Sequence, residues 1–180
     1  MLYFADGRWW GWHDKGVDRP ALGLTAADVQ DRFRSFAGVK VSIEGNEAHL
    51  VKDPEIPRLR DVSMGNTEAV FSSEPDGLAT GRNSGFQAIN LAWLAGAAQI
   101  LLLGYDMKTA SDRPHWFGDH PIPTHPYTIE SFRAGYEKLA RRMPPGLDII
   151  NCSRDTALTC FPRATLESLL PDPAAAALPA

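Results

Sequence analysis

Cysteine is scarce in this sequence, which has only Cys152 and Cys160 among its 180 residues. Two thiols are too few for the disulfide framework on which many small secreted domains depend. Both cysteines lie in apolar surroundings. We therefore expect them to be reduced core residues of a cytoplasmic protein.

Long hydrophobic runs are missing as well. The uninterrupted aliphatic stretches, such as residues 100–103, fall far short of the roughly 20 apolar residues that a membrane-spanning helix needs. The N-terminus does not place a basic segment before an apolar one, as a secretory signal would. We expect no membrane span and a cytoplasmic location.

The sequence also lacks an excess of positive charge. It contains 18 Lys and Arg against 22 Asp and Glu, a net charge of −4, and no basic cluster stands out. A surface that binds nucleic acid needs a concentrated positive field to attract phosphates. The composition therefore argues against nucleic acid as a partner.

What remains is the composition of an ordinary globular protein, with 44% hydrophobic and 22% charged residues. A chain of this length buries roughly two thirds of its unfolded surface in one core. We expect a single domain over residues 1–170 and a disordered, low-complexity tail over residues 171–180, PDPAAAALPA.

The first half of the chain predicts a strand, a helix and a second strand. Residues 2–5 (LYFA) are typical of a short buried strand. Residues 24–38 predict a helix that begins with the capping pair Thr25 and Asp28. The alternating segment 39–45 (VKVSIEG) predicts a half-exposed strand, and the residues that follow, up to position 80, favour no particular structure.

The second half alternates helices and strands. Ser84 and Gln87 predict a capping box that begins a helix, apolar on nearly all sides and ending at Gly96. The aliphatic run QILLL then predicts a parallel strand covered on both faces. After a loop rich in Pro and His, a helix is predicted from Thr128 to Met143 and a last strand over residues 147–153.

This alternation predicts a doubly wound α/β fold with a mostly parallel sheet, in which ligands bind beyond the carboxyl ends of the strands. The turn of Asn83, Ser84 and Gly85 should meet residues 104–106 at this edge. The turn begins a helix, whose free N–H groups and positive dipole end can hold a phosphate, although a plain helix cap is the alternative.

Three further polar residues follow predicted strands. Asp106 ends the aliphatic strand, where its carboxylate can accept sugar hydroxyls, coordinate Mg²⁺ or act as a base, or simply cap the loop. Asp6 has the same position after the first strand, although Asp-Gly is also a turn signal. Ser153 comes at the end of the last strand and, with its neighbour Arg154, is a candidate for contacting a phosphate or a base, although NCSRDTAL is equally typical of a polar loop.

Three histidines, His115, His120 and His125, lie within eleven residues of one another. An imidazole in this loop can act as a general base or pair with a phosphate. The spacing matches no known zinc motif, so we predict no metal site of that kind. The alternative is that Pro and His residues only stiffen the loop.

Residues 81–107, GRNSGFQAINLAWLAGAAQILLLGYDM, resemble the central segment of a group of Rossmann-like proteins. The shared pattern is a small-residue turn ending in Ser-Gly, an Ala-rich helix and an aliphatic strand closing in Gly-x-Asp. The group includes the MptE-like (DUF115) relatives of 6-hydroxymethylpterin diphosphokinase, uncharacterised phage and prophage proteins and, more distantly, the sialyltransferases of glycosyltransferase family 42. The resemblance implies a Rossmann-like three-layer α/β/α fold.

In the sialyltransferases, the Ser-Gly turn contacts the nucleotide-sugar donor, and a histidine before the penultimate helix is the general base. The resemblance places Asn83 and Ser84 at the nucleotide and Asp6 near the donor. It places His125 in the role of the base, with His115 and His120 as competing assignments.

These families usually begin with a strand and a Gly/Pro/Ser turn that holds the donor phosphates. No such turn precedes Met1, so by this resemblance we expect the fold to lack the first βα unit. The sheet edge left exposed would favour a homo-oligomer.

Three functions follow from the residues and the resemblance together. The leading hypothesis is a protein that binds a nucleotide or nucleotide sugar, as a transferase with a loop histidine as general base. The second is an MptE-like diphosphotransferase with Mg²⁺ on Asp106. The third is a non-catalytic protein that keeps the fold.

Overall fold

The structure is a computed structural model of the chain. It describes residues 1–4, 16, 18–44, 51, 53–63, 70–108 and 129–170.

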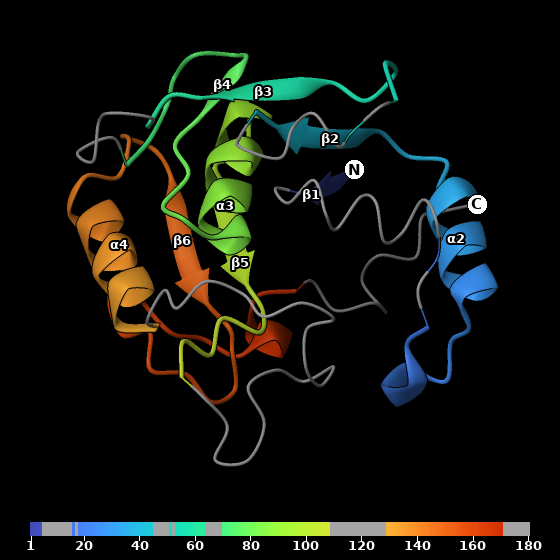
Figure 1. Cartoon of the computed structure of the whole chain (residues 1–180). Coiled ribbons are helices and arrows are strands. Elements are labelled where there is room, and N and C mark those ends of the chain that lie inside the picture. The colour runs from blue at the N-terminus through green and yellow to red at the C-terminus, as the bar shows by residue number, and fades with distance from the viewer. Residues whose placement is uncertain are drawn as a thin grey trace, which may run out of the picture.

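The chain forms an α/β fold in which the named strands pair in parallel, as the sequence predicts, and which is consistent with the Rossmann-like class (Figure 1). One ladder has the order β1-β2-β3-β4. Its strands are β1 (Leu2–Phe4), β2 (Lys40–Ile43), β3 (Arg58–Asp61) and β4 (Gly77–Leu78). A second ladder pairs β5 (Gln99–Leu102) with β6 (Asp148–Asn151).

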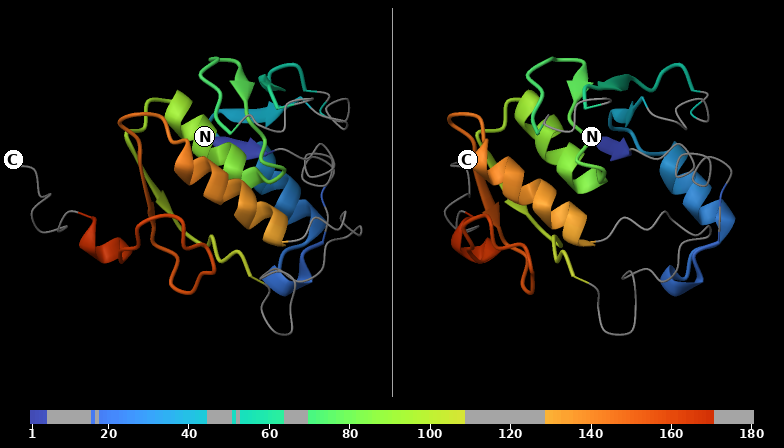
Figure 2. Two further views of the ribbon diagram at one scale, coloured as in Figure 1. Left: turned by 90° about the vertical axis from the view of Figure 1, so that its left-hand side faces the viewer. Right: turned by 60° about the vertical axis from the view of Figure 1, so that its left-hand side comes forward.

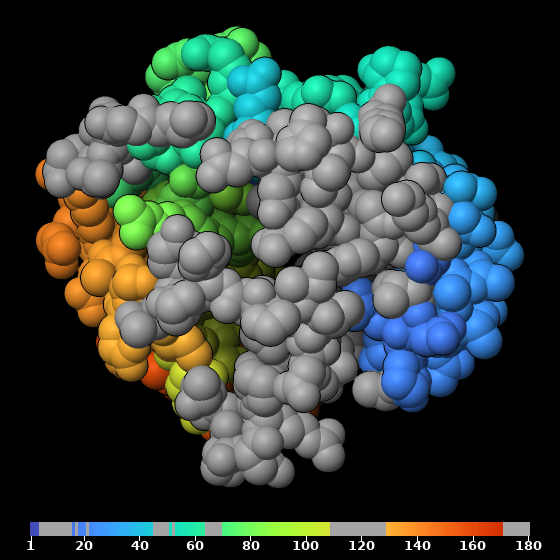
Figure 3. Space-filling model, viewed as in Figure 1, coloured from blue at the N-terminus to red at the C-terminus, as the bar shows by residue number. Residues whose placement is uncertain are grey.

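Helices α3 (Ser84–Leu94) and α4 (Ile129–Arg141) lie side by side on one face of the β5-β6 ladder (Figures 1 and 2). Helix α2 (Ala26–Arg34) lies on the other side of the molecule from α4 (Figure 3). Two short 3₁₀ turns, η1 (Pro20–Leu22) and η3 (Leu166–Ser168), complete the helical elements of the described residues.

Helix α2 begins as predicted. The Thr25 hydroxyl accepts a hydrogen bond from the Asp28 N–H, and the Asp28 carboxylate accepts one from the Thr25 N–H, which together form a capping box. The hydrogen bonds from Thr25 lower the pKa of the Asp28 carboxyl. The helix ends at Arg34, about one turn before the Gly38 that we expected to end it.

Strand β2 differs from the prediction of a half-exposed strand, because Val41, Ser42 and Ile43 are all buried. The strand lies between β1 and β3, so both of its edges are paired. Its consecutive buried residues point to opposite faces, so both faces are covered as well. Strand β5 is less covered than its aliphatic sequence predicts. Its one buried residue is Leu102, whereas cover on both faces is expected.

The predicted capping box of Ser84 and Gln87 is wrong. The N-cap of α3 is Asn83, whose backbone is extended and whose side chain accepts a hydrogen bond from the Phe86 N–H at 2.9 Å. Ser84 is therefore the first helical residue. Gln87 is buried and accepts a hydrogen bond from the Tyr3 hydroxyl of β1 at 2.7 Å.

The rest of α3 matches the prediction. No residue between Gly85 and Leu94 is exposed, and the helix ends at Leu94 with Ala95 as its C-cap, followed by Gly96 with a positive φ of 93°. Helix α4 buries Tyr136 and Leu139 on its apolar face, as its spacing indicates. Phe86 of α3 packs against Tyr136 of α4, with their ring centroids 5.5 Å apart.

The larger hydrophobic core lies between α3, α4, β5 and β6. Its most deeply buried members include Phe86, Ile89, Leu102, Tyr136, Leu139 and Ile149. A smaller cluster of Phe33, Val51 and Ile56 lies under α2. Both cysteines are free, Cys152 being buried and Cys160 half-buried.

Asn90, which is fully buried on α3, connects the helix to the segments before and after β4. Its side-chain oxygen accepts hydrogen bonds from the N–H groups of Ser72 and Ala79, at 2.9 and 3.0 Å. Its amide nitrogen donates to the Ser72 carbonyl at 3.0 Å. A buried amide with all of these partners fixes the helix against the first ladder.

Within the described parts of the chain, each helix is too short or too polar to cross a membrane. The expected tail, residues 171–180, lies outside the described residues.

Replacing Asn90 by Leu should lower the free energy of unfolding by about 3 kcal/mol or more. Three buried backbone groups of Ser72 and Ala79 lose their partner, and each unsatisfied group costs about 1–3 kcal/mol. Urea denaturation followed by circular dichroism measures the change. The matched control is Gln99→Leu at an exposed amide, where a change within about 0.5 kcal/mol is expected. Equal losses in the two variants would contradict this role of Asn90.

Candidate functional site

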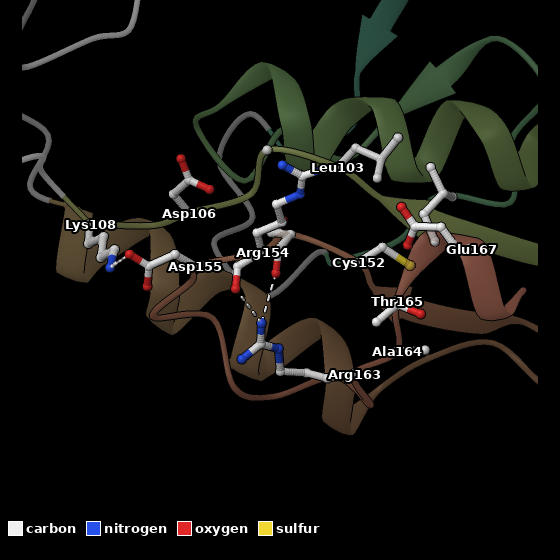
Figure 4. A pocket seen from close by; sticks show the side chains of 13 residues that line it. Leu103, Asp106, Lys108, Cys152, Arg154, Asp155, Arg163, Ala164, Thr165 and Glu167 are labelled. Atoms are coloured by element: carbon white, nitrogen blue, oxygen red, sulfur yellow. Dashed lines mark hydrogen bonds and ion pairs between the residues drawn. The ribbon is translucent and has the colours of Figure 1, made fainter.

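A pocket of about 1200 Å³ opens beyond the carboxyl ends of β5 and β6 (Figure 4). It is the place where parallel α/β sheets bind ligands, and the volume is sufficient for a nucleotide-sized molecule. Residues from the two loops that follow β5 and β6, and from the segment around η3, line it. Asp106 and Ser153, both predicted from the sequence, are among them.

Hydrogen bonds join the two loops at the base of the pocket. The Ser153 hydroxyl accepts from the Tyr105 N–H at 2.8 Å, and the Thr156 hydroxyl donates to the Tyr105 carbonyl at 2.6 Å. The Ala157 N–H donates to the Asp106 carbonyl at 2.7 Å. Ser153 therefore has a defined structural partner, and the backbone that carries Asp106 is held in place.

Arg163 holds the loop after β6 from the other side. Its guanidinium donates to the carbonyls of Ser153 and Arg154, at 2.8 and 3.1 Å. The chain reaches this position because the segment returns to β6, where the Asn151 N–H donates to the Pro162 carbonyl at 2.8 Å. The Arg163 guanidinium thus orders the wall of the pocket through these hydrogen bonds.

The pocket contains three charged side chains that have no hydrogen-bond or ion-pair partner within the described residues. They are Asp106, Arg154 and Glu167, each on an exposed residue. Lys108 differs, because it forms an ion pair with Asp155. An open pocket with two free carboxylates and a free guanidinium can bind a ligand that carries both negative charge and hydrogen-bond donors.

The turn of Asn83 to Gly85 does meet the loop after β5, as the sequence predicts. The Tyr105 hydroxyl donates to the Gly85 carbonyl at 3.0 Å, and the Tyr136 hydroxyl donates to the Asn83 side-chain oxygen at 2.8 Å. A Cβ atom at Gly85 would lie only 2.9 Å from the Tyr136 hydroxyl. The small residue is therefore needed so that the two tyrosines can pack against the turn.

This packing separates the turn from the pocket. Asn83, Ser84 and Gly85 are not among the residues that line it. The Asn83 oxygen is occupied by the Phe86 N–H and by the Tyr136 hydroxyl, whereas Ser84 is exposed. Asn83 and Gly85 thus act on the site indirectly, by accepting the hydrogen bonds that hold Tyr136 and Tyr105 in place.

Burial raises the pKa of the Tyr105 hydroxyl to about 12. Burial, and to a smaller extent Tyr105 and Cys160, also raise the pKa of Tyr136. Both hydroxyls therefore stay protonated at neutral pH and act as hydrogen-bond donors to the turn.

The remaining predicted site residues, Asp6, His115, His120 and His125, lie outside the described residues. Within the described ranges, no group of three or more His, Cys, Asp or Glu side chains is placed to hold a metal ion.

Five charged or hydroxyl residues of the pocket were not predicted from the sequence: Lys108, Asp155, Arg163, Thr165 and Glu167. The segment FPRATLESLL has charged and hydroxyl residues but no periodic signal that it returns to the sheet. The return depends on the bridge between Asn151, at the end of β6, and Arg163, a pairing that no spacing rule predicts.

No protein-family model matches the chain, and comparison with curated proteins and with solved structures finds no significant match.

Replacing Tyr105 by Phe should make stability less sensitive to alkaline pH. The Tyr105 pKa is about 12 in the folded chain, against about 10 in an unfolded one, so its contribution is complete below pH 10 and is lost as the pH rises towards 12. The free energy of unfolding, measured by denaturation at pH values from 8.5 to 11.5, should therefore fall more steeply with pH for the wild type than for Tyr105→Phe. An equal fall in both proteins would show that this hydroxyl is not protected by burial.

Proposed function

We propose that the protein binds a nucleotide or nucleotide sugar in the pocket beyond β5 and β6. The observation that supports this most directly is the pair of partner-free side chains of opposite charge, Arg154 and Asp106, within the described part of one open pocket. This position at the carboxyl ends of parallel strands is the usual ligand edge of an α/β sheet.

Each of these side chains matches one part of such a ligand. The guanidinium of Arg154 can form two parallel hydrogen bonds to a phosphate, a geometry in which arginine is favoured over lysine. The carboxylate of Asp106 can accept hydrogen bonds from the hydroxyls of a ribose or another sugar. Lys108, which is paired with Asp155, adds a second cation at the end of the pocket where Asp106 lies.

A transferase activity would require a base in addition to this binding site. The histidine loop, His115, His120 and His125, follows Asp106 and Lys108 in the chain and supplies the candidates. In the leading hypothesis one of them deprotonates an acceptor hydroxyl while the pocket holds the leaving nucleotide. The resemblance of residues 81–107 to sialyltransferases and MptE-like proteins favours a transfer reaction.

The MptE-like alternative, diphosphate transfer, uses the same pocket but places Mg²⁺ on Asp106. This alternative is favoured by the free carboxylate of Asp106 at the pocket wall. It differs from the leading hypothesis in one measurable respect, since ligand binding should then depend on Mg²⁺.

Replacing Arg154 by Ala should weaken nucleotide binding by roughly 10- to 100-fold, because hydrogen bonds to a charged group contribute about 1.5–3 kcal/mol. The measurement is isothermal titration with CMP, UDP, GDP and ATP, after a thermal-shift screen. Arg32→Ala, in α2 and away from the pocket, is the matched control and should leave binding unchanged. The absence of binding by all four nucleotides, with and without Mg²⁺, would overturn the proposed function.

Replacing Asp106 by Asn separates the two transfer reactions. If the pocket binds the nucleotide directly, wild-type affinity should be the same with and without Mg²⁺, and Asp106→Asn should weaken binding equally in both conditions. A gain in affinity with Mg²⁺ that Asp106→Asn abolishes would favour diphosphate transfer instead. The control is Asp31→Asn on the exposed surface of α2.

A further inference from the structure

The two ends of the pocket differ in chemistry. In the view of Figure 4, Asp106, Lys108 and Asp155 lie towards one end, whereas Leu103, Cys152 and Glu167 lie towards the other, with Arg154 between them. The first end carries only charged side chains. The second combines an apolar wall with one carboxylate.

The apolar wall consists of Leu103, Cys152, Ala164 and Leu166. Leu103 is 56% exposed although Leu102 directly before it is buried, because successive side chains of an extended segment point to opposite sides. Its side chain lies on the pocket rather than in the core beneath it. An exposed apolar side chain in a pocket provides a surface against which a flat ring can pack.

Glu167 is the one acidic residue at this end of the pocket among the described residues, and no other described side chain pairs with it. Its neighbour Thr165 is the N-cap of η3, and its hydroxyl oxygen accepts a hydrogen bond from the Ser168 N–H. Glu167 therefore supplies the one carboxylate that this end of the described pocket offers to a ring on Leu103.

A carboxylate accepts hydrogen bonds and donates none at neutral pH, so it selects a ring edge with two adjacent donors. Guanine presents such an edge with its N1–H and its 2-amino group. Adenine and cytosine place an acceptor nitrogen beside their amino group, and uracil has a single N–H between two carbonyls. Hypoxanthine has the N1–H but lacks the 2-amino group.

We propose that the pocket is specific for a guanine nucleotide, with the guanine packed on Leu103 and bound at its donor edge by Glu167, and with the phosphates at Arg154. This inference rests on the proposed function, since it assigns the base that the same pocket recognises. It makes Glu167 a specificity-determining residue that does not contact the phosphates.

The test compares the affinities of GDP, IDP, ADP, CDP and UDP by isothermal titration. The wild type should bind GDP at least roughly tenfold more tightly than IDP or any other diphosphate, because a bidentate hydrogen bond to a carboxylate is lost in the others. Glu167→Gln should lose this preference while retaining the affinity for the other four. The matched control Glu55→Gln, at an exposed position before β3, should keep it.

Leu103→Ser should weaken the binding of all five nucleotides by a similar factor. It removes the leucine of the apolar wall but leaves the carboxylate that recognises the donor edge of the base. Circular dichroism establishes that each variant is folded. If every diphosphate binds the wild type equally, or if Glu167→Gln still prefers GDP, the guanine assignment is wrong while the proposed function stands. If no nucleotide binds, both fail.

Discussion

The fold depends on the hydrogen bonds of polar side chains on helix α3, which connects the two ladders of strands. Asn90 binds the backbone before and after β4, Gln87 binds Tyr3 of β1, and Asn83 binds Tyr136 of α4. A buried amide must satisfy its hydrogen-bonding groups, because burying them without partners costs free energy. These bonds fix the helix against the first ladder and α4, while its apolar residues pack in the core with β5 and β6. The edge where the pocket forms follows from this position.

The loops that line the pocket are held in place by hydrogen bonds in which the side chains of Arg154 and Asp106 take no part. Tyr105 joins the loop after β5 to the N-terminal turn of α3, and Ser153 and Thr156 join it to the loop after β6. Arg163 binds two carbonyls of the second loop. Because Arg163, the hydroxyls and backbone groups make these contacts, the side chains of Arg154 and Asp106 remain available to a ligand.

The sequence predicts the site unevenly, and particular residues show why. Asp106 and Ser153 follow apolar strand segments, so their place at the ligand edge could be read from the pattern. Because a helix start resembles a phosphate site, the pattern predicts Asn83, Ser84 and Gly85 at the ligand. In the structure the two tyrosines occupy that turn, and nothing in the spacing of Tyr105 and Tyr136 indicates that they converge.

The sequence by itself determined the type of the longer elements: the capping box of α2, the Gly96 that follows α3 and the strand character of β5 and β6 follow from local propensity and periodicity. It did not indicate β3 and β4. Only the tertiary structure decided which strand is covered on both faces, which residue caps α3 and which segment closes the pocket. The physical reason is that burial and side-chain partners come from residues distant in sequence, and spacing along one element contains no information about them. Gly81 to Met107 shows both cases, since its helix and strand were predictable and the partners of its two turns were not.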